Sequence, residues 1–362
     1  MKQLDISVEN VNGKAEQLCR SQKVKRYQSL GRDLVQLKFE IGSLIGGQLQ
    51  RVEESISSTL STKFGEVQDL ADRASMHAGK RLRPILVLLA SKAVAGPTCD
   101  PNSDKDLVHI ATSVELVHMA SLVHDDLMDH AETRRHQPTI SHACGENAAV
   151  LLGDYLFTRA YAAAAECRQT LPARMIARAA THLCEGELRQ QLSASQWKLN
   201  RSNYFSILFQ KTASLCQVSC RLGGWRSGAN HLQQKVLADF GKYLGLAFQI
   251  HDDWLDYWGD EEVGKTLGTD LAQLKPTLPL MEFMNCSTEN DKAELLIALT
   301  RPTHESLAHA RRMIRESTAG ERTLKAAQRL AAKAIRALDT LPESESKQLL
   351  KALAVFSVSR SV

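Results

Sequence analysis

The sequence predicts an almost entirely α-helical protein, and its composition carries this prediction. Apolar residues make up 43% of the 362 residues, but only 9 residues are proline, 20 are glycine and 5% are aromatic. The long stretches between Gly and Pro breaks are rich in Ala, Leu, Gln and Arg and contain few β-branched runs, which favours helices over strands. No shift in composition divides the chain. We therefore expect one helical domain over residues 28–362, preceded by an extension over residues 1–27.

Apolar residues at helical spacing place the expected helices in order. The pattern predicts helices over residues 28–60, 85–94, 106–129, 145–166, 171–193, 202–226 and 232–258, and further helices beyond residue 277. Pro84 fits the first turn of its helix, because the N–H that proline lacks would have no partner there. The segment 130–144 and the Gly- and charge-rich segment 259–276 are expected to be loops.

Charge and cysteine usage exclude several classes of protein. Lys and Arg number 45 and Asp and Glu 41, so overall charge gives no support for a nucleic-acid partner. Eight cysteines scatter along the chain without a CxxC pair, and residues 1–27 lack the apolar core of a signal peptide. Reduced thiols and a cytoplasmic location are expected. No apolar run reaches about 18 residues, so no transmembrane helix is expected.

A seven-residue pattern occurs twice, as VHDDLMD at 123–129 and IHDDWLD at 250–256. The first and last Asp of each copy share a helical face, where like charges repel. One acidic cluster is usually a solvated helix end, but two near-identical copies after apolar helices favour cations bound between the carboxylates. Few, carboxylate-only ligands suit Mg²⁺ that keeps its waters and bridges to phosphate. The six carboxylates are Asp125, Asp126, Asp129, Asp252, Asp253 and Asp256.

Basic and polar residues near these segments form two candidate diphosphate sites. The first contains Lys80, Arg81 and Arg83 at a helix start, His118 two turns before Asp125, and Arg134 and Arg135 in the following loop. A helix start and bidentate guanidinium groups both favour phosphate, although a buried core histidine explains His118 equally well. The second contains Lys211, Thr212, Gln249, Lys265 and Lys275. Its two loop lysines could cover a bound diphosphate or be ordinary surface lysines.

Taken together, these segments resemble the trans-isoprenyl diphosphate synthases. GKRLRP at 79–84, DDLMD at 125–129 with RR at 134–135, KT at 211–212, QIHDDWLD at 249–256, GKTLGTDL at 264–271 and KPTLPL at 275–280 occur in that family's order and approximate spacing. The resemblance covers roughly residues 30–362. It implies an all-α, isoprenoid-synthase-type helical bundle around a deep central cavity, usually in a homodimer. It also implies a prenyltransferase that uses two to three Mg²⁺ ions to join isopentenyl diphosphate head to tail to an allylic diphosphate.

The resemblance assigns roles to individual residues. It implies Mg²⁺ ligation by Asp125, Asp129 and Asp252, with Asp126, Asp253 and Asp256 in support. Lys80, Arg83, His118 and Arg135 would hold the diphosphate of isopentenyl diphosphate. Arg134, Lys211, Thr212, Gln249, Lys265 and Lys275 would hold the allylic diphosphate. Asp125, Asp129, Lys211, Asp252 and Lys265 are the residues expected to act in catalysis.

Two positions depart from the family pattern. His136 stands where the family usually has Gly after its Arg pair, and Leu274 where it usually has Gly before KPTLP. Both are expected to alter loop geometry rather than ligand chemistry.

Product length is predicted from residues preceding Asp125 on its helix. Ser121, Ala120 and Val117 are small to medium, whereas short-chain members of the family often carry a bulky aromatic four or five residues before this Asp. We therefore expect more than four isoprene units, such as a quinone side chain, passed on to membrane enzymes. A short-chain farnesyl or geranylgeranyl diphosphate synthase is the alternative within the family.

Two further alternatives remain. A terpene cyclase or head-to-head synthase would not need the basic site at 79–84 and 134–135. A silent partner subunit would typically lack Asp or Lys in these motifs, and this chain keeps them.

Overall fold

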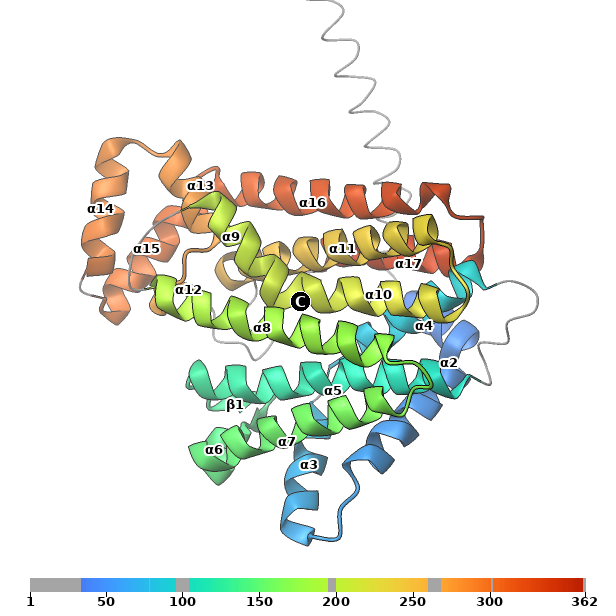
Figure 1. Cartoon of the computed structure of the whole chain (residues 1–362). Coiled ribbons are helices and arrows are strands. Elements are labelled where there is room, and N and C mark those ends of the chain that lie inside the picture. Colours follow the sequence, from blue (N-terminus) through green and yellow to red (C-terminus); the bar gives the residue numbers. More distant parts are fainter. Residues whose placement is uncertain are drawn as a thin grey trace, which may run out of the picture.

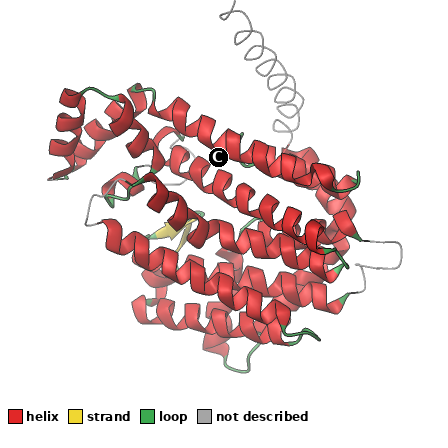
Figure 2. Ribbon diagram, turned by 45° about the horizontal axis from the view of Figure 1, so that its top comes forward, coloured by secondary structure: helices red, strands yellow, loops and turns green. Residues whose placement is uncertain are grey.

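The structure, a computed structural model, describes residues 34–77, 79–95, 104–194, 200–259, 268–300 and 302–360. These residues form helices, apart from connecting segments and one antiparallel hairpin of strands β1 (Thr133–Arg134) and β2 (Gln137–Pro138). Figure 2 shows the hairpin beside the helical bundle. The all-α prediction is confirmed. The extension over residues 1–27 lies outside the described residues, so the domain boundary at residue 28 stays a prediction.

The helices lie roughly side by side in layers (Figure 1). The central helix α5 (Lys105–Met128) packs against α7 (Glu146–Ala165) and α4 (Leu82–Val94). The next layer contains α10 (Ser214–Arg226) and α11 (His231–Trp258), which pack against each other. Helix α10 also packs against α4. The helix α16 (Ala319–Ala337) covers α11 from outside.

The remaining elements surround this core. They are α2 (Leu34–Leu60), α3 (Gly65–His77), α6 (Ile140–Cys144), α8 (Leu171–Ala194), α9 (Arg201–Leu208), the π-helix η1 (Phe209–Ala213), α12 (Thr269–Ala272), α13 (Leu278–Cys286), α14 (Glu289–Thr300), α15 (His304–Glu316), the 3-10 helix η3 (Leu338–Thr340) and α17 (Glu345–Phe356).

Two long helices carry the acidic segments, and both begin at side-chain caps. Asp104 accepts a hydrogen bond from the backbone N–H of Leu107 at the start of α5, and Asn230 forms a capping box with Gln233 at the start of α11. Such caps satisfy N–H groups that have no partner inside the helix. The two helices are therefore fixed at their beginnings, and the acidic segments come near their ends.

Helix α5 is apolar because the bundle surrounds it. Its length and composition would allow it to cross a membrane, but 78% of the relevant window is buried inside the protein. Val114, Val117 and Ala120 are fully buried. A helix that is apolar on all sides is typical of the core of a large helical protein, so α5 is a core helix of this bundle.

Three predicted segments contain structure that the sequence did not predict. The helix expected over 202–226 is present, as α9, η1 and α10 in unbroken succession, and the π-turn η1 within it adds one residue to the helical repeat. The segment 130–144 contains the hairpin and α6, which starts where Thr139 accepts a hydrogen bond from the N–H of His142. The segment 259–276 contains the short helix α12.

Candidate active site

The two acidic segments lie opposite each other at one end of the bundle. Asp125 and Asp126 occupy the last turn of α5, and Asp129 caps it. The second segment lies in the last turns of α11. The Nζ atom of Lys275 lies 3.0 Å from an oxygen of Asp129 and 3.8 Å from an oxygen of Asp270. Asp270 is bonded through its backbone N–H to Asp256 of the second segment, so Lys275 spans the space between the two segments.

In each acidic segment, burial raises the pKa of one carboxyl group strongly. Burial, with a smaller contribution from Glu187 and Asp129, raises the pKa of Asp125 to about 6. Burial likewise raises the pKa of Asp253 to about 6, although hydrogen bonds from Tyr204 and Gln249 oppose this shift. Carboxyl groups held this way gain most from a nearby cation.

Asp270, which is not part of either acidic segment, shows the largest resolved shift of this group. Burial, followed by the charges of Asp256 and Asp253, raises its pKa to about 8, against the opposing charges of Lys275 and Lys211. It therefore belongs electrostatically to the second acidic segment.

Lys211 reaches the first acidic segment from the π-turn η1. Its Nζ atom forms an ion pair with Glu187 and lies 3.9 Å from an oxygen of Asp125. It also donates a 3.1 Å hydrogen bond to Gln190. Burial would lower the pKa of Lys211, but the charges of Asp125 and Glu187 outweigh it and raise the pKa. The ammonium group is therefore firmly protonated beside the carboxylates.

Two glycines allow the π-turn to come this close to its neighbours. A Cβ at Gly186 of α8 would lie 2.8 Å from the backbone N of Lys211, and a Cβ at Gly245 of α11 would lie 2.6 Å from the Cα of Ala213. Real Cβ atoms are not found at such distances. The π-turn is thus held between two glycine surfaces, and π-turns inside helices frequently mark functional sites.

A chain of hydrogen bonds connects η1 with the second acidic segment. Thr212 donates to Gln249 at 2.9 Å, and Gln249 donates to Asp253 at 3.1 Å. Tyr204 of α9 donates to the other oxygen of Asp253 at 2.6 Å. Asp253 is therefore held by two neutral donors, and its orientation is fixed.

The predicted basic residues converge beside the acidic segments. Burial, and then the charges of nearby guanidinium groups, hold the pKa of His118 well below its usual value. These groups belong to Arg83, Arg134, Arg81 and Arg135. Burial and the cations Arg360, Lys38 and Arg135 also lower the pKa of Lys80. The cluster combines exposed and half-buried cations, and its place close to a helix start suits an anion.

The start of α4 has an unusual backbone. Arg81 caps the helix in the left-handed conformation, with φ 53°. Its guanidinium group binds Glu53 of α2 at 2.6 Å and the buried Glu115 of α5 at 3.3 Å. These two carboxylates compensate for the backbone strain, and they pair Arg81 with acidic residues of α2 and α5.

Two of the predicted ligands are bound to arginines in the free protein. The Nε atom of Arg134 lies 2.8 Å from both oxygens of Asp126, and Arg360 forms a hydrogen bond with Asp252. The guanidinium group of Arg360 also lies 3.9 Å from the centroid of the Phe248 ring. One oxygen of Asp252 is thus already paired with Arg360.

The two departures from the family pattern keep a glycine-like backbone. His136 has φ 62° and Leu274 has φ 54°, in the left-handed region that favours glycine. The predicted effect of these two residues on loop geometry stays a prediction. Arg135, beside His136, is also left-handed, with φ 52°.

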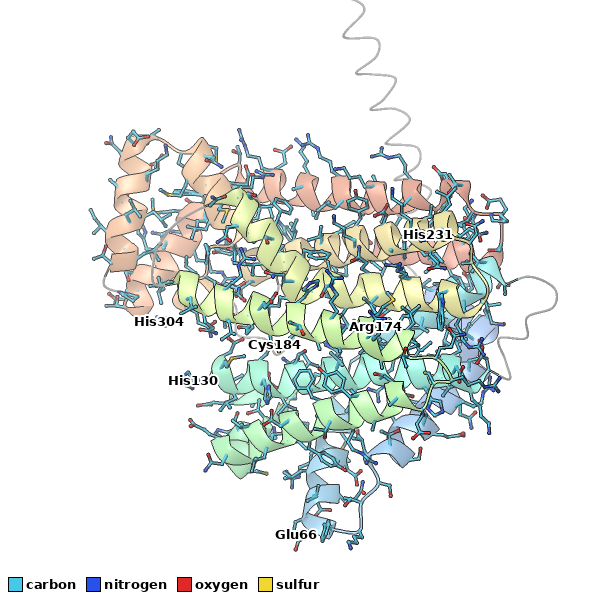
Figure 3. The ribbon with its side chains drawn as sticks, viewed as in Figure 1. Glu66, His130, Arg174, Cys184, His231 and His304 are labelled. Atoms are coloured by element: carbon cyan, nitrogen blue, oxygen red, sulfur yellow. The ribbon has the colours of Figure 1, made fainter. Side chains whose placement is uncertain are left out.

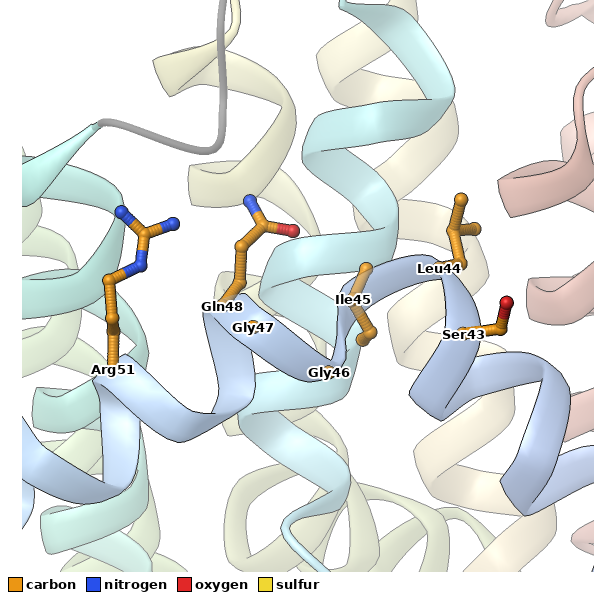
Figure 4. Close-up of a pocket in the computed structure, with 7 residues that line it drawn as sticks. All are labelled: Ser43, Leu44, Ile45, Gly46, Gly47, Gln48 and Arg51. Atoms are coloured by element: carbon orange, nitrogen blue, oxygen red, sulfur yellow. The ribbon is translucent and has the colours of Figure 1, made fainter.

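The residues predicted to set product length are buried on α5. Val117 and Ala120 are fully buried, and Ser121 is 6% exposed and bonds to the backbone of His118. A pocket on α2 is lined by Ser43, Leu44, Ile45, Gly46, Gly47, Gln48 and Arg51 (Figure 4). It contains none of the predicted site residues, so the deep cavity near α5 stays a prediction.

Sequence reasoning missed several residues of this site. Glu187, Tyr204 and Arg360 contact predicted residues, but no motif marks them in the sequence. Asp270 falls within the segment 264–271 and was not given a role. Lys265 lies outside the described residues, so its role stays a prediction.

The donor set fits a divalent cation that binds together with its substrate. Among the described residues, no group of three or more His, Cys, Asp or Glu side chains is arranged as a ready metal centre. The carboxylates instead face a shared space containing Lys211 and Lys275. Mg²⁺ usually takes one or two carboxylates and completes its shell with water and phosphate, and this arrangement provides such ligands.

Facing acidic segments on long helices, beside a cluster of basic residues, are the arrangement expected of a helical enzyme that acts on diphosphates. The polyprenyl synthetase family model matches residues 65–317. An octaprenyl diphosphate synthase from Haemophilus influenzae is 33% identical over 89% of this chain and 97% of its own length. The heptaprenyl diphosphate synthase component 2 of Geobacillus stearothermophilus is 34% identical over 87% of this chain and 96% of its own length.

A solved structure gives the same result. A polyprenyl synthase from Caulobacter crescentus CB15, in complex with calcium and isoprenyl diphosphate, is 31% identical and superimposes with a TM-score of 0.84, covering 89% of this chain and 98% of that one. The chain belongs to the polyprenyl synthetase family. It is a prenyltransferase, a trans-polyprenyl diphosphate synthase of the isoprenoid-synthase fold.

Proposed function

We propose that this enzyme joins isopentenyl diphosphate head to tail to an allylic diphosphate and makes a long-chain product. One observation carries the proposal: Lys211 and Lys275 stand between two acidic segments, directly beside the basic cluster around His118. Two diphosphates need two anion sites within reach of each other. This end of the bundle offers both.

The first substrate site uses the space between the acidic segments. Lys211, Thr212, Arg134, Lys275 and Lys265 bind the allylic diphosphate, together with Gln249 on α11. Two to three Mg²⁺ ions would supply positive charge for the departing diphosphate. Asp125, Asp129 and Asp252 would hold these ions, with Asp126, Asp253 and Asp256 in support. The cationic side chains would act in the same direction, because negative charge develops on the diphosphate as the C–O bond breaks.

The second site uses the basic cluster. Lys80, Arg83, His118 and Arg135 hold the diphosphate of isopentenyl diphosphate. Its double bond then attacks the allylic cation, a new C–C bond forms, and a proton leaves to the released diphosphate. Holding both reactants in place removes much of the entropic cost of their encounter.

The experiment that tests this function uses the chain alone. It should consume radiolabelled isopentenyl diphosphate with farnesyl diphosphate and Mg²⁺, and mass analysis of the dephosphorylated product should give more than four isoprene units. A product of four units or fewer would identify the short-chain alternative. Failure of the purified chain to consume either substrate would support a silent partner subunit, and a cyclised product without isopentenyl diphosphate would identify a cyclase.

We also propose that the enzyme is a homodimer that forms through α7 and α8. The two helices pack side by side, and α8 crosses the front of the molecule at Cys184 (Figure 3). Their outer faces expose large apolar side chains, namely Val150, Leu151, Tyr161, Leu188 and Leu192, of which Leu151, Leu188 and Leu192 are more than 60% exposed. Several exposed large apolar side chains on two neighbouring helices are typical of an interface.

A second copy of this chain covers that surface in the proposal. Leu151→Glu combined with Leu188→Glu should convert the dimer into a monomer in sedimentation velocity, whereas Leu296→Glu on α14 should not. A cytoplasmic location accompanies this proposal, because Cys144 and Cys184 are exposed free thiols and a reducing compartment preserves such groups.

A further inference from the structure

The outer face of α16 carries basic side chains that the proposed reaction does not use. Seven residues of this helix are exposed, and five of them are basic. They are Glu321, Arg322, Lys325, Gln328, Arg329, Lys333 and Arg336. The chain as a whole has 45 basic and 41 acidic residues, so this face departs strongly from the average.

The five basic residues follow one line along the helix. We call Arg322, Lys325, Arg329, Lys333 and Arg336 the α16 basic stripe. Steps of three and four residues keep them within an arc of about 80° and along about 21 Å of the helix. The neighbouring α15 differs, because its exposed Asp, Glu, Lys and Arg residues are two acids and two bases, namely Glu305, Glu316, Arg312 and Arg315.

Contacts within the protein neutralise only part of the stripe. Lys325 bonds to Glu321 at 2.5 Å, and Arg322 lies 3.9 Å from Glu282, with half of its own side chain exposed. Within the described part of the chain, no ion pair involves Arg329 or Arg336. Like charges at this spacing repel one another, so an anionic partner would relieve a cost that the folded protein carries.

The cationic surface continues from the stripe onto α11. Lys333 lies 5.7 Å from the centroid of the Tyr243 ring, and Lys242 of α11 lies 5.8 Å from the same ring. The surface is therefore about two helices wide at this point, and α16 runs along the upper edge of the bundle (Figure 1).

We propose that the α16 basic stripe docks the enzyme on an anionic lipid bilayer. The apolar side of α16 is already buried in the protein, through residues such as Ala327 and Ala334. The helix therefore stays on the surface of the bilayer and binds through charge. A straight row of cations suits a flat anionic surface, and α16 exposes no aromatic side chain on which nucleic-acid bases would stack.

The biological purpose of this surface rests on the proposed function. A long-chain prenyl diphosphate is an amphiphile that is poorly soluble in water, and a bilayer is the medium into which it partitions. Docking brings the site of synthesis close to that medium. The charges of the stripe do not depend on this reasoning, so lipid binding is tested without substrate.

The test is co-sedimentation with vesicles of phosphatidylglycerol and phosphatidylcholine, compared with pure phosphatidylcholine vesicles, at low and at physiological salt. A basic residue near an anionic surface strengthens binding about fivefold. Arg329→Glu combined with Arg336→Glu should therefore weaken binding at least about 25-fold. The matched control reverses two exposed charges on the opposite edge of the bundle, Lys63→Glu with Arg73→Glu, and should bind like the unaltered protein.

Each other outcome overturns the assignment. Equal binding to pure phosphatidylcholine, or unchanged binding of the stripe variant, would remove the stripe from the interaction. Tighter capture by duplex DNA, with the same loss in the variant, would assign the stripe to nucleic acid. Consumption of isopentenyl diphosphate in detergent solution is measured separately, so a chain that makes product but ignores vesicles refutes the docking surface, and a chain that binds vesicles but makes no product refutes the proposed function.

Discussion

The Nζ atom of Lys275 lies 3.0 Å from a carboxylate oxygen of Asp129, although the two residues are 146 positions apart in sequence. This contact joins the end of α5 to the segment that follows α11. It also places a protein cation where the proposed function requires a metal ion. Lys275, Lys211, Arg134 and Arg360 each pair with an Asp of the two acidic segments in the free protein, and in the proposed function Mg²⁺ and substrate would take over these contacts.

The raised pKa values predict how pH and Mg²⁺ act together on stability. Folding raises the pKa of Asp125 and Asp253 from the usual 3.8 to about 6. The folded state thus holds protons more tightly than the unfolded state, and the contribution of these groups to stability is full below about pH 4 and is lost as pH rises to about 6. Mg²⁺ competes with those protons. The rise in Tm on adding Mg²⁺ should therefore be small at about pH 5 and large at about pH 7.5.

Differential scanning fluorimetry with Mg²⁺ or with chelator measures this difference. Asp125→Asn removes one of the titrating groups and should flatten the pH dependence of the Mg²⁺ effect. The same rise in Tm at both pH values would contradict the prediction.

The two glycines beside the π-turn predict that one added methyl group lowers stability and weakens binding of the allylic substrate. Gly245→Ala places a Cβ 2.6 Å from the backbone of Ala213, and because α11 and η1 must move apart, unfolding free energy should fall by about 1–3 kcal/mol. Lys211 and Thr212 would move with the π-turn. The KM for the allylic substrate should therefore rise, whereas the KM for isopentenyl diphosphate should change little.

A matched substitution separates this effect from the helix propensity of alanine. A Cβ at Gly46 of α2 meets no atom within 4 Å, so Gly46→Ala should stabilise the protein by about 0.5–1 kcal/mol. Urea unfolding compares the two variants. Equal stability of both would show that the π-turn has room to adapt.

The left-handed backbone at His136 predicts a rank order of substitutions. The left-handed conformation destabilises the folded state by about 1–2 kcal/mol when the residue has a Cβ, and by more when the residue is β-branched. His136 is exposed, so no buried contact is lost when it is replaced. His136→Gly should be more stable than His136→Val by at least about 1 kcal/mol in urea unfolding. A reversed order would mean that the hairpin can relax out of this conformation.

The acidic segments could be predicted because their chemistry is local. Asp125 and Asp129 share a helical face through spacing alone, and the apolar residues before them indicate a core helix. The π-turn could not be predicted, since it depends on contacts with Gly186 and Gly245, which lie in two other helices. The contact between Arg360 and Asp252 spans 108 residues and no motif signals it. Side chains at positive φ, such as Leu274, were also hidden, because a sequence pattern predicts glycine there.

Product length offers the most direct test of the residues under the first acidic segment. Ala120 is fully buried on α5, five residues before Asp125. If the growing chain extends along this side of α5, Ala120→Phe should block it and shorten the product, and Ala120→Leu should shorten it less. Mass analysis of the dephosphorylated products from farnesyl diphosphate and isopentenyl diphosphate measures the length.

A second buried alanine controls for the strain of a larger side chain. Ala334 of α16 is also fully buried but lies outside the site, and both Phe variants should lose about 1–3 kcal/mol from overpacking. Ala334→Phe should keep the original product length, whereas Ala120→Phe should not. An unchanged length in a folded, active Ala120→Phe or Ala120→Leu enzyme would place the growing chain elsewhere in the bundle, since neither side chain could then line its path.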